Sequence, residues 1–129
     1  GTDAIVSAIE DAMTRARLLE SLIEASPDFE ILCPAQFGIV CFRAVAASAQ
    51  TKDLDELNER INRRVVAEGR FLISSTRLHG AFSLRMCTLG FRTTESDIHE
   101  LFATVERALA AELAVWSDTE RELHRHEPA

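Results

Sequence analysis

The chain has 129 residues, 47% apolar and 27% charged, a balance typical of one soluble globular domain. No apolar run approaches the ~20 residues that a membrane-spanning helix needs, and no signal-peptide pattern opens the chain. The formal net charge of −7, without a block of Lys or Arg, argues against a nucleic-acid partner because phosphates would repel such a surface.

The first predicted element is a helix over residues 3–25. Its apolar residues recur every three or four positions, as in an amphipathic helix, and form one stripe: Ile5, Ile9, Ala12, Ala16, Leu19 and Ile23. Pro27 predicts the end of this helix, because the residue before a proline disfavours helical angles.

Two strands are predicted next. In Phe29–Cys33 the period of two places Phe29 and Glu30 on opposite faces. Residues Pro34–Gln36 predict a turn. The segment Gly38–Val45 is apolar on both faces, which predicts a central strand covered on both sides.

A second helix is predicted to begin at Asp53, whose carboxylate suits a helix cap, with Glu56 three positions later as in a capping box. Gly69 suits the left-handed conformation that ends many helices. The predicted inward side chains are Leu54, Leu57, Ile61 and Val65.

The last third of the chain predicts a hairpin and a long helix. Residues 70–78 and 81–89 form two strand-like arms around His79-Gly80. Thr93 or Thr94 caps the last helix, whose apolar stripe runs from residue 98 to 116. Residues 118–129 are charged and are expected to fray.

The predicted order is therefore α-β-β-α-β-β-α. Hairpin pairs of strands separated by helices favour the α+β class, here a mostly antiparallel four-stranded sheet packed against helices. No linker or internal repeat divides the sequence, so residues 1–129 are predicted to form a single domain.

Few residues suggest chemistry. The chain lacks the GxGxxG, GxxxxGK[ST], GxSxG and HExxH motifs. His124 and His126 lie in the charged tail without a third ligand nearby, so no metal site is predicted. The three cysteines form no CxxC pair and are interpreted as buried, reduced thiols of a cytoplasmic protein: Cys33, Cys41 and Cys87.

Arg85 is the strongest single candidate for a site residue. It lies mid-strand among apolar neighbours, on the face opposite Leu84 and Met86. A guanidinium is a natural bidentate partner for a substrate carboxylate, and the alternative is an arginine on the solvated face of a half-buried sheet. Arg43, also mid-strand, carries the same two interpretations.

Several of these segments, read together, resemble the group II pyridoxal-phosphate-dependent amino-acid decarboxylases. Phe29–Arg43 is similar to the family's FE…P…GLVCFR segment, and Leu54–Asn62 to its N..L..RIN helix. Phe82–Cys87 followed by Arg92–Ile98 resembles the ending F.LR…C…RT.ES.I. The similarity runs in family order from about residue 5 to 110, and it fits the aromatic-amino-acid branch better than the glutamate branch.

The resemblance implies the small C-terminal domain of a fold-type-I enzyme that converts an amino acid to an amine and CO2. In that family the large domain carries the lysine that binds pyridoxal phosphate, and the enzyme is a dimer. This chain has a single lysine, Lys52, in a polar stretch that reads as a loop. We therefore expect no cofactor-binding or catalytic residue here, no activity from the fragment alone, and a missing large domain as its partner.

For Arg85 the resemblance implies a role near the substrate carboxylate or between domains, since it matches the arginine of the family's LR strand. Two other interpretations stay open. An autonomous small-molecule-binding module predicts a closed, concave pocket with convergent polar groups. A dimerisation module predicts a two-fold interface of standard size. A decarboxylase fragment predicts instead a large exposed apolar patch where the missing domain docks.

Overall fold

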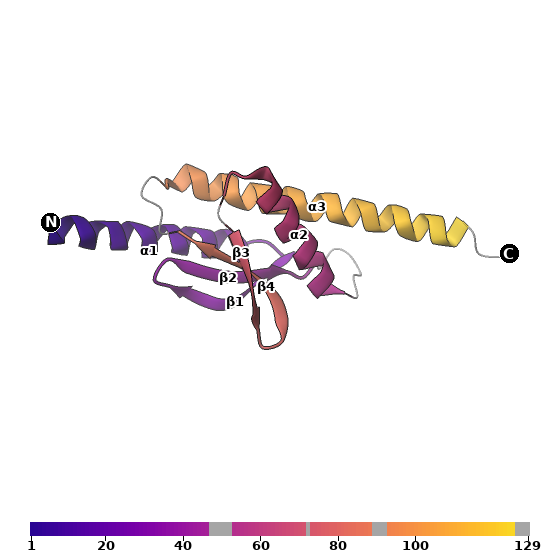
Figure 1. Ribbon diagram of the computed structural model, residues 1–129, viewed down its shortest axis with the longest axis horizontal. Helices are drawn as coiled ribbons and strands as arrows, with labels where there is room; N and C mark the ends of the chain where they lie inside the picture. The colour runs from indigo at the N-terminus through magenta and orange to yellow at the C-terminus, as the bar shows by residue number, and fades with distance from the viewer. Residues whose placement is uncertain (47–52, 72, 89–92, 126–129) are drawn as a thin grey trace.

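The computed structural model describes residues 1–46, 53–71, 73–88 and 93–125 (Figure 1). Its elements, in chain order, are α1 (Thr2–Glu24), β1 (Phe29–Gln36), β2 (Ile39–Ala44), α2 (Leu54–Glu68), β3 (Ile73–Leu78), β4 (Ala81–Cys87) and α3 (Glu95–Arg125). The strands form one antiparallel sheet in the order β1-β2-β4-β3. The predicted α+β class and the order α-β-β-α-β-β-α are confirmed.

The hydrophobic core lies between the helices and one face of the sheet. Val40 lies opposite Met86 and Phe42 opposite Leu84, and these four side chains belong to the core. The buried helix residues packed with them are Leu19, Ile23, Leu57, Ile61, Val65, Ile98, Leu101, Phe102 and Val105. Burial of each such side chain contributes roughly 1.5–3 kcal/mol, so this single interface holds the domain together.

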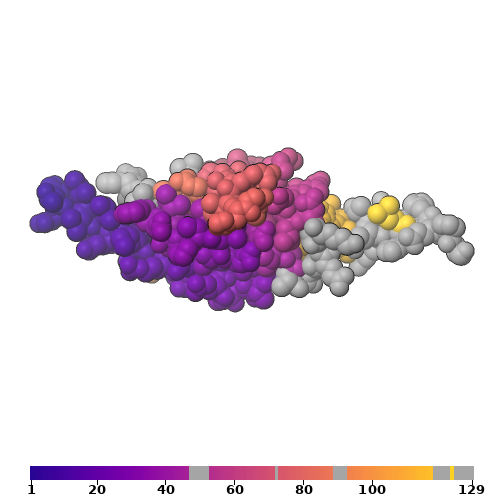
Figure 2. All heavy atoms as spheres, turned by 90° about the horizontal axis from the view of Figure 1, so that it is seen from below, coloured from indigo at the N-terminus to yellow at the C-terminus, as the bar shows by residue number. Residues whose placement is uncertain are grey.

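The other face of the sheet, called the open face below, carries Glu30, Cys41, Arg43 and Arg85. Glu30, Arg43 and Arg85 lie outside the core, while Cys41 is buried but is not part of the main core cluster. Figure 2 shows the molecule from the strand side, where residues of the sheet form a continuous surface. The prediction for residues 38–45 is thus right about the central position of β2, but within the described residues no element covers its second face.

The β1–β2 turn also differs from the prediction. Residues Pro34–Gln36, predicted as a turn, belong to β1, and the turn is made by Phe37 and Gly38 with φ angles of 48° and 77°. Two successive residues of positive φ suit the twist of a tight hairpin. The register shifts on both sides of Cys33. Pro34 is tolerated there because an edge strand has an unpaired side that needs no N–H donor.

The predicted helix caps are present. The Asp53 carboxylate accepts a hydrogen bond from the Glu56 amide at 3.0 Å, and Gly69 ends α2 with a φ of 71°. Thr94 rather than Thr93 caps α3, because its hydroxyl and amide exchange hydrogen bonds with Asp97.

Helices α1 and α3 extend past the sheet at opposite ends of the molecule (Figure 1). Ile5 and Ile9, which begin the predicted stripe of α1, are 63% and 45% exposed. Helix α3 is continuous to Arg125, so residues 118–125, expected to fray, are helical here, while 126–129 lie outside the described residues. Among the described helices, none is both long and apolar enough to cross a membrane.

Candidate functional site

Arg85 is a half-buried side chain in the middle of β4, on the open face of the sheet. It lies opposite Cys41 of β2 and Ser74 of β3, so strands flank it on both sides. In the described part of the chain, no carboxylate lies within ion-pairing distance of its guanidinium. A half-buried positive charge without a counter-charge among the described residues suits the binding of an anionic group.

Arg43, the second mid-strand arginine, differs from Arg85 in this respect. Glu30 lies opposite it across β1 and β2, and its carboxylate accepts a hydrogen bond from the Arg43 Nε at 2.6 Å. The charge of Arg43 is therefore neutralised within the domain. The sequence allowed the same two interpretations for both arginines, and the ion pair with Glu30 now distinguishes Arg43 from Arg85.

Two of the three cysteines face each other across the hairpin. Cys33 of β1 is the register partner of Cys41 of β2. Cys41 is 9% exposed. Burial raises the pKa of the Cys41 thiol, as does the neighbouring Cys33, while Arg85 acts in the opposite direction. Cys33 is half-buried and Cys87 is exposed, so the sequence interpretation of three buried thiols is right only for Cys41.

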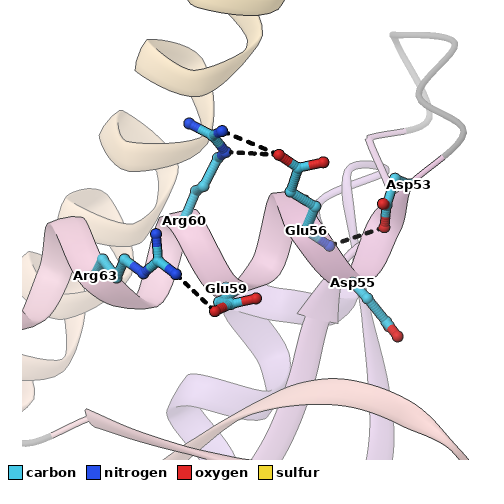
Figure 3. Close-up of a pocket in the computed structure, with 6 residues that line it drawn as sticks. All are labelled: Asp53, Asp55, Glu56, Glu59, Arg60 and Arg63. Atoms are coloured by element: carbon cyan, nitrogen blue, oxygen red, sulfur yellow. Dashed lines mark hydrogen bonds and ion pairs between the residues drawn. The ribbon is translucent and has the colours of Figure 1, made fainter.

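A surface groove runs along the beginning of α2 (Figure 3). Its charged side chains pair with one another: Glu56 with Arg60 at 3.0 Å and Glu59 with Arg63 at 2.7 Å. Such i,i+4 pairs stabilise a helix by a few tenths of a kcal/mol. The other two carboxylates of the groove are also engaged, Asp53 with the Glu56 amide and Asp55 with the Phe82 amide and Arg77, so this groove is not the candidate site.

Sequence reasoning missed two buried polar residues. Asn58 is fully buried, and its amide exchanges hydrogen bonds with the N–H and C=O groups of Ala44 at 2.8 and 3.0 Å. Glu112 is 4% exposed and accepts a hydrogen bond from the Arg64 Nε at 2.6 Å. The available signal for Asn58 is a polar residue one position after Leu57 in the inward stripe of α2.

The remaining candidates do not form a site within the described residues. His79 occupies the β3–β4 turn with a φ of 52°, and His99 is exposed on α3. No group of three or more potential metal ligands is present in the described ranges. Lys52 and His126 lie outside them, as does the side chain of His124.

Comparison with known proteins identifies what this domain is related to. No protein-family model matches the chain. It is 28% identical to an aromatic-L-amino-acid decarboxylase of Bacillus atrophaeus over 116 residues, which is 89% of this chain and 24% of the relative. It is 33% identical to a phenylacetaldehyde synthase of Arabidopsis thaliana over 95 residues, covering 74% of this chain and 19% of the relative.

A solved structure of the same family has the same fold. The crystal structure of Oryza sativa TDC with PLP and tryptamine superposes with a TM-score of 0.80 at 25% identity, covering 87% of this chain and 24% of that chain. The chain belongs to the group II pyridoxal-phosphate-dependent amino-acid decarboxylases. This decarboxylase domain spans a quarter or less of the length of these relatives.

The described residues of the decarboxylase domain do not fit the family's cofactor. Pyridoxal phosphate is anchored through a lysine amine, and the described ranges contain no lysine. The groove on α2 is lined by carboxylates and arginines that are paired with one another, and the two arginines of the groove between α2 and α3 are paired with glutamates. Within these ranges, therefore, no residue fits the role of the cofactor's anchor.

Proposed function

We propose that this domain forms one wall of the active site of a pyridoxal-phosphate-dependent amino-acid decarboxylase, whose cofactor is held by a large domain outside this chain. The complete enzyme converts an amino acid, with an aromatic one favoured, to the amine and CO2. The domain alone has no such activity. The chain's length, a quarter or less of its relatives, and its single lysine support this assignment.

The observation that carries the proposal is the open face of the sheet. It carries Arg85, which has no carboxylate partner among the described residues, opposite Cys41 on a surface that no described helix covers. A guanidinium that faces only water contributes little to the stability of the domain. Against a second domain it offers two parallel donors to a substrate carboxylate or to an acidic group of that domain.

A second surface supports docking to a large domain. Ile5, Val6, Ile9 and Met13 of α1 are exposed on neighbouring turns. Phe37, at the β1–β2 turn, is 80% exposed. Exposed apolar residues that gather at one end of a domain suit an interaction site. We refer to these five residues as the α1 patch.

The turn that carries Phe37 is fixed beside α1. The Thr88 hydroxyl lies 2.8 Å from the carbonyl oxygen of Ala12 and 2.9 Å from that of Gly38. This bridge holds the hairpin tip near the middle of α1, so both parts of the α1 patch lie at one end of the molecule (Figure 1). We assign the patch to the large domain, because most of the length of the relatives lies outside this chain.

The remaining features of the complete enzyme belong to the same proposal. The free thiols favour a reducing compartment such as the cytoplasm. The family resemblance favours a homodimer. Pyridoxal phosphate, bound by the large domain, supplies the electron-accepting chemistry, while this domain contributes a charged wall and excludes water.

Docking is tested by producing the rest of the decarboxylase polypeptide separately and measuring its binding to this chain by sedimentation. Replacing Ile5 and Ile9 together by Asp is expected to weaken the complex about tenfold or more, because two apolar contacts become buried charges. Val66→Asp, at an exposed apolar position on α2, is the matched control and should bind like the wild type.

Three results would overturn the docking proposal. The first is equal binding by the double variant. The second is a stable two-fold dimer of this chain alone with no affinity for the rest, which would favour a dimerisation module. The third is binding that is lost only in the Val66→Asp control.

A further inference from the structure

Cys33 and Cys41 have the backbone relationship that a disulfide needs. They are register partners in the antiparallel β1–β2 pair. Partners in such a pair have Cα atoms about 4.5 or 5.5 Å apart, and disulfides span roughly 4.4 to 6.8 Å between Cα atoms. The Cys33 thiol is also near enough to Cys41 to contribute to the raised pKa of the Cys41 thiol.

The surrounding structure favours a disulfide between Cys33 and Cys41 over one that involves Cys87. Register shifts on both sides of Cys33 interrupt the ladder of an edge strand, so β1 can adjust locally. Cys87 on β4 lies opposite Ile39, two positions from Cys41 along β2. Diagonal neighbours of this kind are about 7–8 Å apart, beyond the range of an unstrained disulfide.

We propose that Cys33 and Cys41 form a dithiol site that is oxidised by low-molecular-weight disulfides, of which oxidised glutathione is the probe. The site is a property of this chain and does not depend on the proposed decarboxylase function. Its place on the open face puts the redox change directly beside Arg85.

The reaction balances in two exchange steps. The thiolate of Cys33, the more exposed thiol, attacks one sulfur of the external disulfide, and the other sulfur leaves as a thiol. Cys41 then loses its proton and attacks the Cys33 sulfur of the mixed disulfide, and a second small thiol leaves. Two protein thiols are oxidised, one external disulfide is reduced, and the two protons go to the leaving thiols.

The test uses the full chain, incubated with oxidised glutathione under native conditions, alkylated and analysed by mass spectrometry. We expect an internal Cys33–Cys41 disulfide, which lacks the two thiol hydrogen atoms of the reduced chain, while Cys87 carries the alkyl group or one glutathione. Chymotryptic cleavage after the exposed Phe37 separates the two cysteines in sequence. The two fragments must therefore remain joined until a reductant is added.

Two variants make the result specific. Cys87→Ser is expected to close the same bond at an unchanged rate, because Cys87 is not part of the site. Cys41→Ser is expected to stop at the mixed disulfide between Cys33 and glutathione. If that variant does not fold, Cys33→Ser, which changes a half-buried position, is expected to form no internal disulfide. A bond that involves Cys87, a wild-type chain that forms no internal bond, or closure only after denaturation would overturn the proposal.

Discussion

Arg43 and Arg85 occupy similar sequence contexts, and their counter-charges distinguish them. Because Arg43 is paired with Glu30 and Arg85 has no carboxylate partner among the described residues, only Arg85 is available to bind an anion. In the complete enzyme, Arg85→Ala is expected to lower kcat/KM by roughly 10- to 100-fold, the value of a hydrogen bond to a charged group. Steady-state kinetics provide the measurement.

Arg43→Ala is the matched control for that substitution, since it removes a guanidinium from the same face. It is expected to keep kcat/KM near the wild-type value. If Arg85→Ala retains wild-type kcat/KM while remaining folded by circular dichroism, Arg85 has no role in substrate binding.

Asn58 supports the fold at the residue scale. Its side chain pairs both backbone groups of Ala44 in a fully buried position. Asn58→Ala would leave those groups unsatisfied, so we expect a loss of about 3 kcal/mol in the free energy of unfolding, measured with urea.

Asn62, one turn later on α2, is the control for Asn58. Its buried Oδ1 has no hydrogen-bond partner among the residues that the structure describes. Asn62→Ala is therefore expected to cost about 1 kcal/mol or less. Equal costs for the two substitutions would show that the bonds to Ala44 are not what makes Asn58 important.

For single residues, the sequence predicts the face on which a side chain lies better than it predicts the partner of that side chain. The position of Arg85 opposite the apolar face follows from the period of two in a strand. That Glu30 neutralises Arg43 depends on the register between β1 and β2, which the register shifts around Cys33 alter. Local patterns contain no information on such a shift.

Helix α2 is joined to the β3–β4 hairpin through Asp55. Its carboxylate accepts hydrogen bonds from the Phe82 amide at 2.9 Å and from Arg77 at 3.3 Å. The Phe82 amide, followed by Arg77, lowers the pKa of Asp55 below its usual value. The folded state therefore binds the proton less readily than the unfolded chain does.

A pH dependence follows from this contact between elements. The stabilisation by Asp55 is fully present above the pKa of the unfolded chain and is lost as the pH falls through the lowered folded pKa. Asp55→Asn should have a lower Tm than the wild type at about pH 6, with the difference shrinking towards about pH 3. Melting curves that stay equally separated at both pH values would contradict this origin of the stability.

The elements were largely predictable because their periodicities and caps agree. The stripe of α2 and its caps at Asp53 and Gly69 follow directly from spacing. The turn at Phe37–Gly38 could not be predicted in this way, because Pro34 is a strong turn signal. A proline is accommodated in β1 because β1 is an edge strand, which is a property of the whole sheet. The stripe of α1 was predicted, but local spacing does not reveal that its first turns lack a partner within the domain.

For the whole molecule, the helices cover one face of the sheet while the open face and the α1 patch remain exposed in the described residues. The domain is therefore a folded unit with two surfaces suited to burial. The sequence predicted the class and the family. It did not predict which face stays open, since both faces of β2 carry apolar residues.

The most direct measurement of the central claim is the release of CO2 from an aromatic L-amino acid with pyridoxal phosphate present. The assay compares this chain alone, the rest of the decarboxylase polypeptide alone, and the two combined. Efficient CO2 release only from the combination is the predicted result. CO2 release by the isolated 129 residues, or full activity of the remaining polypeptide without them, would contradict the account.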